Sequence, residues 1–519
     1  MKIKLGVLLG VFAIAAMTDS AAASQCIELD RIVIHDESVN EQEQQKLFLP
    51  YLHQCMDGEL VKALISDVAN HYMSRGYITT RPYLKEQDIT DGEIEISVLK
   101  GVTESIVEAK SGEPSGRTRS AFAFQTGAQL NLRDIETSLE MFNRPPSVDA
   151  KFNIKPGTQA GTSVVEVISE ESSPYHLKLG ATGQQDMRKD NLQLTAEASI
   201  DNPLNINDIL LFRYNGSGVQ KEYQSNNGYE VNYSFPISSY LFELVWSDFT
   251  YRQGVNGFNN TYLSNGDTQG IRGRISKVLM RNQHHKLNLA ASVSHKDTKN
   301  YFSNQLIAVS SYRTTQVQAD LTHTYLQNWG RITSTYSYYQ GTDWFGARND
   351  AYVAAIAGAP QPAKLQFVKH SLDIGLLVYV DERRWNLSSN FHLQKSDDLL
   401  YDNDKLTVGS DYTVRGYRGQ ALYGNNAWYV KNDITRTWLP NLYSDFLQSV
   451  SLFAGLDYGD VACESDNTTS CGQAAGVAAG FSTQSEGLST SFVWSRALKK
   501  LSNNFIIKDL VKLDLTWSF

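Results

Sequence analysis

The fold class is decided by the last nine residues of the chain, Val511-Lys512-Leu513-Asp514-Leu515-Thr516-Trp517-Ser518-Phe519. Hydrophobic and polar side chains alternate along this segment, which ends on an aromatic residue. Alternation with a period of two is typical of a β-strand with one hydrophobic and one polar face. In a transmembrane β-barrel the hydrophobic face contacts lipid, and the polar face lines a water-filled lumen. The segment therefore predicts the last strand of an outer-membrane barrel.

The same alternation extends over residues 174–519. Segments of about 10–18 residues are separated by turn signals such as Asn265-Gly266-Asp267, and no helical periodicity persists. An even number of strands favours a closed antiparallel barrel over a soluble β-sandwich. A β-propeller would repeat a motif every ~40–50 residues, and this region has no such repeat. Sixteen strands are predicted, near residues 175–186, 191–200, 208–216, 228–236, 240–254, 261–280, 285–299, 312–327, 330–345, 364–381, 383–400, 425–438, 449–462, 472–484, 487–498 and 510–519.

The composition excludes two other classes of protein. Of the 519 residues, 41% are hydrophobic and 20% are charged, which is not the composition of a disordered chain. The 47 Lys and Arg residues against 56 Asp and Glu residues give a net charge of −9. Because nucleic-acid binding requires a basic face, this balance argues against a nucleic-acid partner.

Residues 1–23 are predicted to be a signal peptide. Lys2 and Lys4 precede an apolar core at residues 5–17, and Ala21-Ala22-Ala23 provides a cleavage site. The alternatives are a membrane anchor, for which the apolar run is shorter than the ~20 residues required, and a lipoprotein. Gln25 directly before Cys26 disfavours the lipoprotein. We expect the mature chain to leave the cytoplasm.

An exported chain is free to form disulfide bonds. Its four cysteines allow three connectivities, and the sequence alone does not choose among them. Distance along the chain favours Cys26 with Cys55 and Cys463 with Cys471. The alternative is metal binding, but no C-x-x-C motif or neighbouring histidine supports it. We therefore expect neither a metal nor another cofactor.

Two small α/β units are predicted before the barrel, at residues 24–100 and 101–173. In the first, Leu64, Val68 and Tyr72 lie on one face of a helix that Gly76 is placed to end. Strands at 27–35, 77–83 and 93–99 surround it. In the second, Asn131 is placed to cap a helix that Pro145-Pro146 stops, between strands at 103–109, 151–154 and 163–169. The repeated order of elements predicts tandem copies of one module.

A long connection, residues 402–424, follows the eleventh predicted strand. With a periplasmic N-terminus, this connection is extracellular. About eleven residues in each direction, at ~3.3 Å each, span about 35 Å, which exceeds the ~25 Å apolar band of such barrels. The loop is therefore long enough to fold into the lumen. Its centre is Val414-Arg415-Gly416-Tyr417, in which glycine permits a tight turn and Arg415 supplies a planar cation.

A partner for Arg415 is predicted in the strand at 449–462. Phe453, Gly455, Asp457 and Gly459 share the face opposite to the apolar side chains, so Asp457 points into the lumen. We predict a bidentate Arg415–Asp457 pair that locks the inserted loop to the wall. The alternative is a solvated arginine in a mobile external loop and an aspartate surrounded by water.

Several segments resemble a known superfamily. Residues 414–417, the run Phe453 to Gly459 and the terminal Phe519 resemble the outer-membrane transporters that include the barrel assembly factors. Residues 76–81, 131–136 and 155–158 resemble the two polypeptide-transport-associated (POTRA) domains of two-partner secretion transporters. The resemblance implies a 16-stranded antiparallel outer-membrane β-barrel preceded by two periplasmic POTRA domains. It also implies secretion of a large β-helical exoprotein, such as a haemolysin, an adhesin or a contact-dependent toxin.

The resemblance implies further properties. Secretion would be driven by folding of the exoprotein outside the cell, and the barrel assembly machinery would recognise Phe519 as an assembly signal. A POTRA sheet has an exposed edge to which a substrate strand can add, and Pro82 fits an edge strand. The candidate contacts on that edge are Thr79, Thr80, Arg81 and Tyr83.

One departure and three alternatives remain open. Many family members have an N-terminal plug helix, but the first predicted strand begins about three residues after the cleavage site, so pore closure is expected to depend on the loop. The alternatives are a barrel assembly factor, a passive porin and an outer-membrane hydrolase. No G-x-S-x-G or H-E-x-x-H motif supports an enzyme. We expect a monomer in contact with outer-membrane lipid.

Overall fold

The computed structural model describes residues 27–519 except 37–38, 123–125, 187–188, 219–223, 352–362, 383, 440–446, 465–469 and 503–504. It divides into two compact units, Met1–Gly101 and Val102–Phe519. The predicted signal peptide and Cys26 lie outside the described residues, so both stay predictions. No helix in the described ranges is long and apolar enough to cross a bilayer.

The first unit is a three-stranded sheet with helices packed against it. The sheet has the order β2 (Arg31–Ile34), β5 (Glu93–Leu99), β4 (Arg81–Leu84), with β2 parallel and β4 antiparallel to β5. Asn40 and Asp57 cap α1 (Glu41–Phe48) and α2 (Gly58–Ser74), and η1 (Leu49–Tyr51) lies between the two helices. The predicted α2 face is buried together with the β5 side chains Ile94 and Ile96.

The predicted ends of two strands in this unit were wrong. The strand expected at 27–35 is divided into β1 (Ile27–Glu28), which pairs with β3 (Cys55–Met56), and β2. The strand expected at 77–83 begins only at Arg81. Gly76, at φ 94°, ends α2 as predicted, and the Thr80 N–H donates to the Tyr77 carbonyl, so a turn precedes β4.

The second unit begins with the same arrangement. Its sheet has the order β6 (Val102–Glu108), β8 (Thr162–Glu171), β7 (Val148–Pro156), again with one parallel and one antiparallel pairing. Two helices, α3 (Gly116–Ala121) and α4 (Leu132–Phe142), pack beside it. The Asn131 side chain caps α4 as predicted, accepting from the Arg133 N–H at 2.8 Å.

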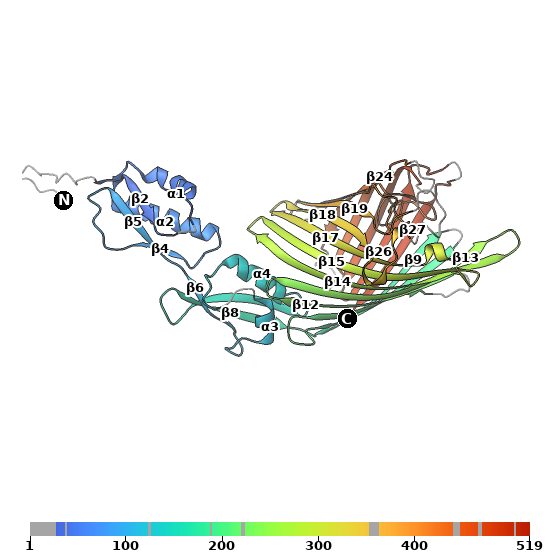
Figure 1. Ribbon diagram of the computed structural model, residues 1–519, viewed down its shortest axis with the longest axis horizontal. Helices are drawn as coiled ribbons and strands as arrows, with labels where there is room; N and C mark the ends of the chain where they lie inside the picture. The colour runs from blue at the N-terminus through green and yellow to red at the C-terminus, as the bar shows by residue number, and fades with distance from the viewer. Residues whose placement is uncertain are drawn as a thin grey trace, which may run out of the picture. The chain divides into compact units, whose positions relative to one another are not determined.

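Sixteen antiparallel strands then close into a barrel (Figure 1). All sixteen predicted strands are present, although their ends differ by several residues. The seam joins β27 to β9, from Val511 opposite Gln185 to Ser518 opposite Lys178. The strands are β9 (Tyr175–Asp186), β10 (Lys189–Asp201), β11 (Ile209–Ser217), β12 (Gln224–Ile237), β13 (Tyr240–Asn256), β14 (Thr261–Arg281), β15 (His285–Phe302), β17 (Tyr312–Gln327), β18 (Gly330–Thr342), β19 (Val368–Val380), β20 (Trp385–Lys395), β23 (Ala427–Trp438), β24 (Leu447–Val461), β25 (Gly472–Ser485), β26 (Leu488–Ala497) and β27 (Asp509–Ser518).

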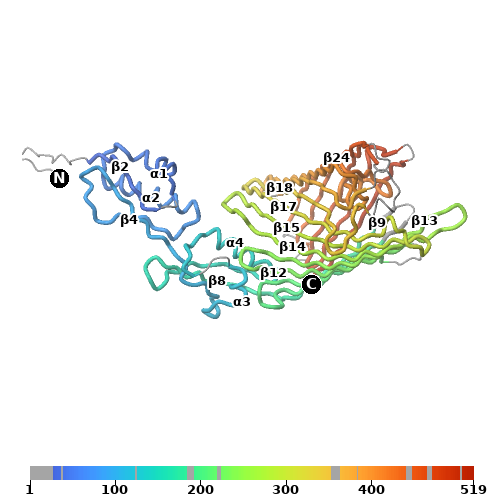
Figure 2. Tube along the Cα trace, viewed as in Figure 1, coloured from blue at the N-terminus to red at the C-terminus, as the bar shows by residue number. Residues whose placement is uncertain are grey.

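Short elements lie in the connections that follow β15 and β18. They are β16 (Gln305–Leu306), η2 (Ala308–Ser310) and η3 (Trp344–Gly346). The strand expected at 383–400 ends at Lys395, because Ser396 and Asp398 turn their side chains to the backbone of Val368, at 2.7 and 2.8 Å. The residues after Lys395 therefore belong to the following loop. Figure 2 traces the same chain as a tube, with β9, β13, β17, β18 and β24 among the labelled barrel strands.

Candidate functional site: a loop held inside the barrel

The connection between β20 and β23, residues 396–426, is named the inserted loop. It contains a hairpin of β21 (Leu406–Val408) and β22 (Leu422–Gly424), which the sequence analysis did not predict. Its tip is residues 414–417. Val414, Arg415 and Tyr417 are 0%, 5% and 2% exposed, so the tip is enclosed by the barrel wall.

Arg415 forms a bidentate ion pair with Asp457 on β24. Its Nε lies 2.6 Å from Asp457 Oδ2, its Nη2 lies 2.7 Å from Asp457 Oδ1, and its backbone N–H donates to Asp457 Oδ2 at 3.0 Å. Asp457 is fully buried, whereas Leu452 and Leu456 on the other face are at least half exposed. The structure thus brings the predicted pair together on the predicted face of the strand.

A second carboxylate contacts the same guanidinium group, and the sequence analysis missed it. Asp433 Oδ1 on β23 accepts from Arg415 Nη2 at 2.7 Å. Lys431, two residues earlier on the same face, donates to the Asp411 carbonyl of the loop at 2.9 Å. The alternation of residues 425–438 was the available signal, because it places both side chains on the polar face. Two anionic and two cationic side chains therefore balance each other around the tip.

Four glycines make room for this approach. A Cβ on Gly455 would lie 2.2 Å from Arg415 Nη2, and one on Gly476 would lie 1.9 Å from the Arg415 carbonyl oxygen. Gly459 faces Val408 of the hairpin, at 2.6 Å from its Cγ1. Gly416 has φ 92°, and its Cβ would collide with the backbone of β26. Of these positions only Gly476 was not considered from the sequence, because it lies on the next strand.

Tyr417 and apolar packing hold the other side of the tip. The Tyr417 hydroxyl lies 2.9 Å from the carbonyl oxygens of Ala475 and Lys499, and it accepts from the Ala475 N–H at 3.0 Å. Its ring packs on Phe505. Phe453, a predicted wall residue, has its ring 5.9 Å from the Arg415 guanidinium carbon. The hairpin and wall share one apolar cluster: Val408, Val414, Tyr417, Leu422, Ala427, Val461, Ala474 and Ala497.

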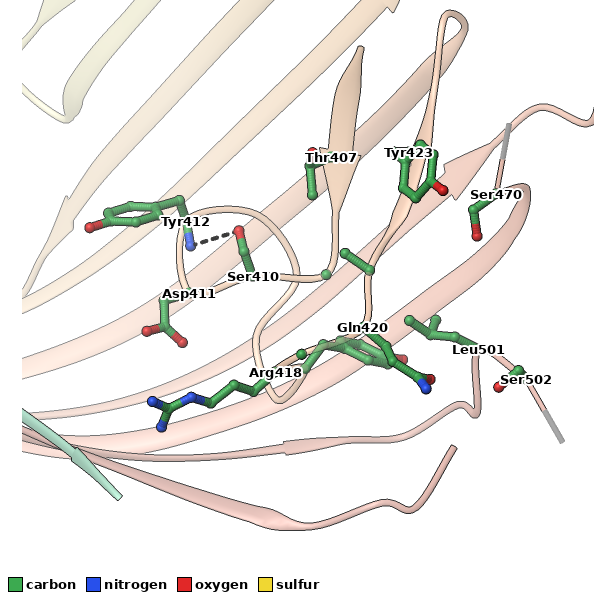
Figure 3. A pocket seen from close by; sticks show the side chains of 14 residues that line it. Thr407, Ser410, Asp411, Tyr412, Arg418, Gln420, Tyr423, Ser470, Leu501 and Ser502 are labelled. Carbon is green, nitrogen blue, oxygen red and sulfur yellow. Dashed lines mark hydrogen bonds between the residues drawn. The ribbon is translucent and has the colours of Figure 1, made fainter. Parts of the chain in front are cut away.

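Two hollows adjoin the loop. The larger, about 790 Å³, is lined by loop residues and by Ser470, Leu501 and Ser502 of the neighbouring extracellular connections (Figure 3). The smaller, about 290 Å³, is lined by Arg415 and by inner-wall side chains of β26 and β27. Asp411 and Tyr412 line both, so this stretch of the loop lies between them.

The predicted POTRA-edge residues are only partly available. β4 is an edge strand of its sheet, and Arg81 and Tyr83 are exposed on it. Thr80 is 0% exposed, and Thr79 lies in the preceding turn, where a Cβ on Gly101 would meet its Oγ1. Their assignment to the edge was therefore wrong, since both threonines precede the strand and pack inward.

The remaining site residues have the following positions. Cys463 and Cys471 form a disulfide in the connection between β24 and β25. The β1–β3 pairing sets Glu28 opposite Cys55, but Cys26 is outside the described residues, so the Cys26–Cys55 bond stays a prediction. The Phe519 N–H donates to the Leu177 carbonyl at 2.9 Å, which extends the seam. Its role as an assembly signal also stays a prediction.

Family models match most of the chain. Residues 161–483 match the haemolysin secretion/activation protein family, residues 27–101 a POTRA domain of the type found in that family, and residues 103–156 a second POTRA domain. The chain belongs to the haemolysin secretion/activation family. Members of this family are outer-membrane transporters of two-partner secretion, and their POTRA domains are periplasmic. We refer below to the two modules as POTRA 1 and POTRA 2.

Individual relatives agree with this assignment. The outer membrane transporter CdiB of Escherichia coli O6:K15:H31 is 30% identical over 92% of this chain and 79% of its own length. The hemolysin transporter ShlB of Serratia marcescens is 25% identical over 80% of this chain and 72% of its own. The solved structure of CdiB from Escherichia coli has a TM-score of 0.87 at 27% identity, covering 98% of this chain and 93% of that one.

Proposed function

We propose that this transporter binds a large β-helical exoprotein in the periplasm and passes it, extended, through the barrel to the cell surface. The exoprotein is of the haemolysin, adhesin or contact-dependent toxin type. The observation that carries the proposal is the buried tip, with Arg415 bonded to Asp457 inside the barrel. A lock of this kind lets the lumen stay closed at rest and open when the substrate arrives.

Recognition is proposed to occur by strand addition to POTRA 1. β4 ends its sheet, and its outer edge has unpaired backbone groups to which an extended segment can bond. Arg81 and Tyr83 are the exposed side chains on that strand. An extended chain needs a polar route, which inward-facing Ser, Thr and Gln side chains supply. We propose that folding of the exoprotein outside supplies the free energy, and that no catalytic group, metal or cofactor takes part.

Two rival functions are weaker. A passive porin has no use for a sheet edge presented in the periplasm. An assembly factor that inserts other barrels is the closest rival, and it is weaker because the chain matches the haemolysin secretion/activation family and transporter relatives. The closed single-chain barrel supports a monomer with lipid around its apolar face. The C-terminal strand ending in Phe519 is proposed to be the segment that the barrel assembly machinery recognises.

The test is a comparison of surface and medium proteins from the producing strain. The gene is deleted and then restored as wild type, Arg415→Ala or Arg274→Ala. Arg274 is the matched control because it pairs with the buried Asp320 at 2.6 Å, and among the described residues its ion pairs are with Glu243 and Asp320 of the barrel strands. We expect one large protein to disappear on deletion, return with wild type and Arg274→Ala, and fall by at least about tenfold with Arg415→Ala. If no secreted protein depends on the gene, the proposed function is wrong.

A further inference from the structure

The connection between β24 and β25 is closed by the Cys463–Cys471 disulfide. We call residues 462–464 and 470–471, which this bond joins, the disulfide turn. The bond cross-links the extracellular ends of two strands that form the wall side of the lock. β24 carries Asp457, and β25 carries Ala475 and Gly476, which contact Tyr417 and Arg415.

Both flanks of the disulfide turn also bind the root of the inserted hairpin. On the Cys471 side, Ser470 and Tyr423 exchange two backbone hydrogen bonds of 3.0 and 3.2 Å, which adds a third segment to the β21–β22 sheet. Figure 3 shows these two residues on neighbouring segments. On the Cys463 side, the Ala462 N–H donates to the Asn426 carbonyl at 2.9 Å. Each flank therefore contacts a different side of the root.

Glu464 bonds to two residues of the hairpin root at once. Its carboxylate accepts from the side-chain amide of Asn425 and, at 2.9 Å, from that of Asn426. Asn425 is 2% exposed, and its side-chain oxygen accepts from the Leu400 N–H at 2.9 Å. The two asparagines join β22 to β23, so Glu464 holds the point at which the loop returns to the barrel wall.

We propose that the disulfide turn is a strap that positions the inserted loop. The covalent bond keeps Glu464 and Ser470 on opposite sides of the hairpin root, and this fixes the depth at which Arg415 meets Asp457. Without the bond, the two flanks are joined only by the chain that runs between them, so there is more conformational freedom to lose when the contacts form. The hairpin then leaves the lumen more often. This inference rests on the proposed locking function of the loop.

Trypsin added to intact cells measures how often the loop emerges. Cleavage at the partly exposed Arg418 is not used as the readout. Lys405 and Arg415 are 7% and 5% exposed, so these two trypsin sites are protected while the loop is inserted. We expect the Cys463→Ser/Cys471→Ser variant to be cut at these residues roughly tenfold faster than wild type, and to show a higher leak conductance in planar bilayers. Cys26→Ser/Cys55→Ser is the matched control, since it removes the other two cysteines, and it should behave as wild type in both measurements.

Two further arms keep the test decisive. If the double serine variant does not assemble, the folded wild type is treated with dithiothreitol, which is oxidised to its cyclic disulfide as the two protein thiols form. Mass spectrometry of the alkylated thiols verifies the reduction. Glu464→Ala, with the disulfide intact, should give an intermediate cleavage rate.

Unchanged cleavage after verified loss of the bond overturns the strap. Arg415→Ala separates the two ideas, because if it releases the loop while loss of the bond does not, the lock stands and only the strap fails.

Discussion

At the scale of single residues, the lock depends on an ion pair in which both partners are buried. The Arg415 side chain is 6% exposed and that of Asp457 is 0% exposed. Removing one partner of such a pair leaves the other charge without compensation, which costs about 3–5 kcal/mol. The inserted state of the loop is therefore much more sensitive to these two residues than to exposed charges on the same barrel.

The two carboxylates around Arg415 are predicted to contribute unequally. Asp457 accepts three of the hydrogen bonds from Arg415, and Asp433 accepts one. We expect Asp457→Asn to reduce secretion at least about tenfold. The loss of secretion in Asp433→Asn should be several-fold smaller than that. Quantitative immunoblots of the secreted protein measure the difference. Equal losses would show that the bidentate geometry with Asp457 is not what holds the loop.

Gly476 provides a steric test of the same contact. Its Cβ would lie 1.9 Å from the Arg415 carbonyl oxygen, a backbone atom that can move only if the loop moves. We expect Gly476→Ala to raise trypsin cleavage at Arg415 in intact cells. Gly273→Ala is the control, because no atom lies within 4 Å of a Cβ at that position. Similar cleavage of both variants would contradict the close approach of loop and wall.

At the scale of elements, POTRA 2 is bound to the periplasmic rim through charged side chains. Glu140 on α4 pairs with Arg281 at 2.6 Å and also with Lys286, at the turn between β14 and β15. On α3, Arg117 stacks on Phe142 and bonds to Glu171 at 2.6 Å and to Asn207, in the turn after β10, at 3.2 Å. These contacts join the module to two different periplasmic turns.

The Glu140 contact is predicted to weaken in acid. Burial raises the pKa of Glu140, but the hydrogen bonds and charges of Lys286 and Arg281 outweigh it, so the net pKa lies below the ordinary 4.5. A lowered carboxyl pKa contributes stability that is present above 4.5 and is lost as the pH falls through the folded-state value. We expect the protection of the α4 amides from hydrogen exchange, corrected for the intrinsic rate at each pH, to fall below this range. Glu140→Gln should exchange faster at neutral pH and change little on acidification, and an unchanged pH response in that variant would refute the assignment.

The barrel strands could be predicted from the sequence because each has hydrophobic side chains on one face and polar side chains on the other. The same rule placed Asp457 in the lumen and would have placed Asp433 there. The β21–β22 hairpin was not predictable, because each of its strands has only three residues, which is too short for an alternating pattern to be recognised. Thr79 and Thr80 were misassigned because β-branched residues are typical of strands. Here they lie in a turn directly after α2, in which the Thr80 N–H donates to the Tyr77 carbonyl.

At the scale of the whole molecule, the two compact units are proposed to divide recognition from conduction. Deleting residues 27–101 removes POTRA 1 with its β4 edge and leaves the unit that begins at Val102. We expect the shortened protein to insert as a heat-modifiable barrel and to secrete nothing, since the substrate strand has no sheet to join. Electrophoresis of unheated samples checks insertion, and blots of the medium check secretion. Secretion at wild-type levels would remove POTRA 1 from the mechanism.

The central claim is that the exoprotein passes through the lumen of this barrel. Photo-crosslinking from one strand tests it most directly. On β18, Tyr339 faces the lumen side chain Lys369, whose Nζ lies 5.0 Å from its ring, whereas Tyr336 is on the lipid-facing side and 46% exposed. With benzoylphenylalanine at each position during secretion, we predict an adduct with the exoprotein at 339 and none at 336. No adduct at 339, or equal adducts at both positions, would contradict passage through the barrel.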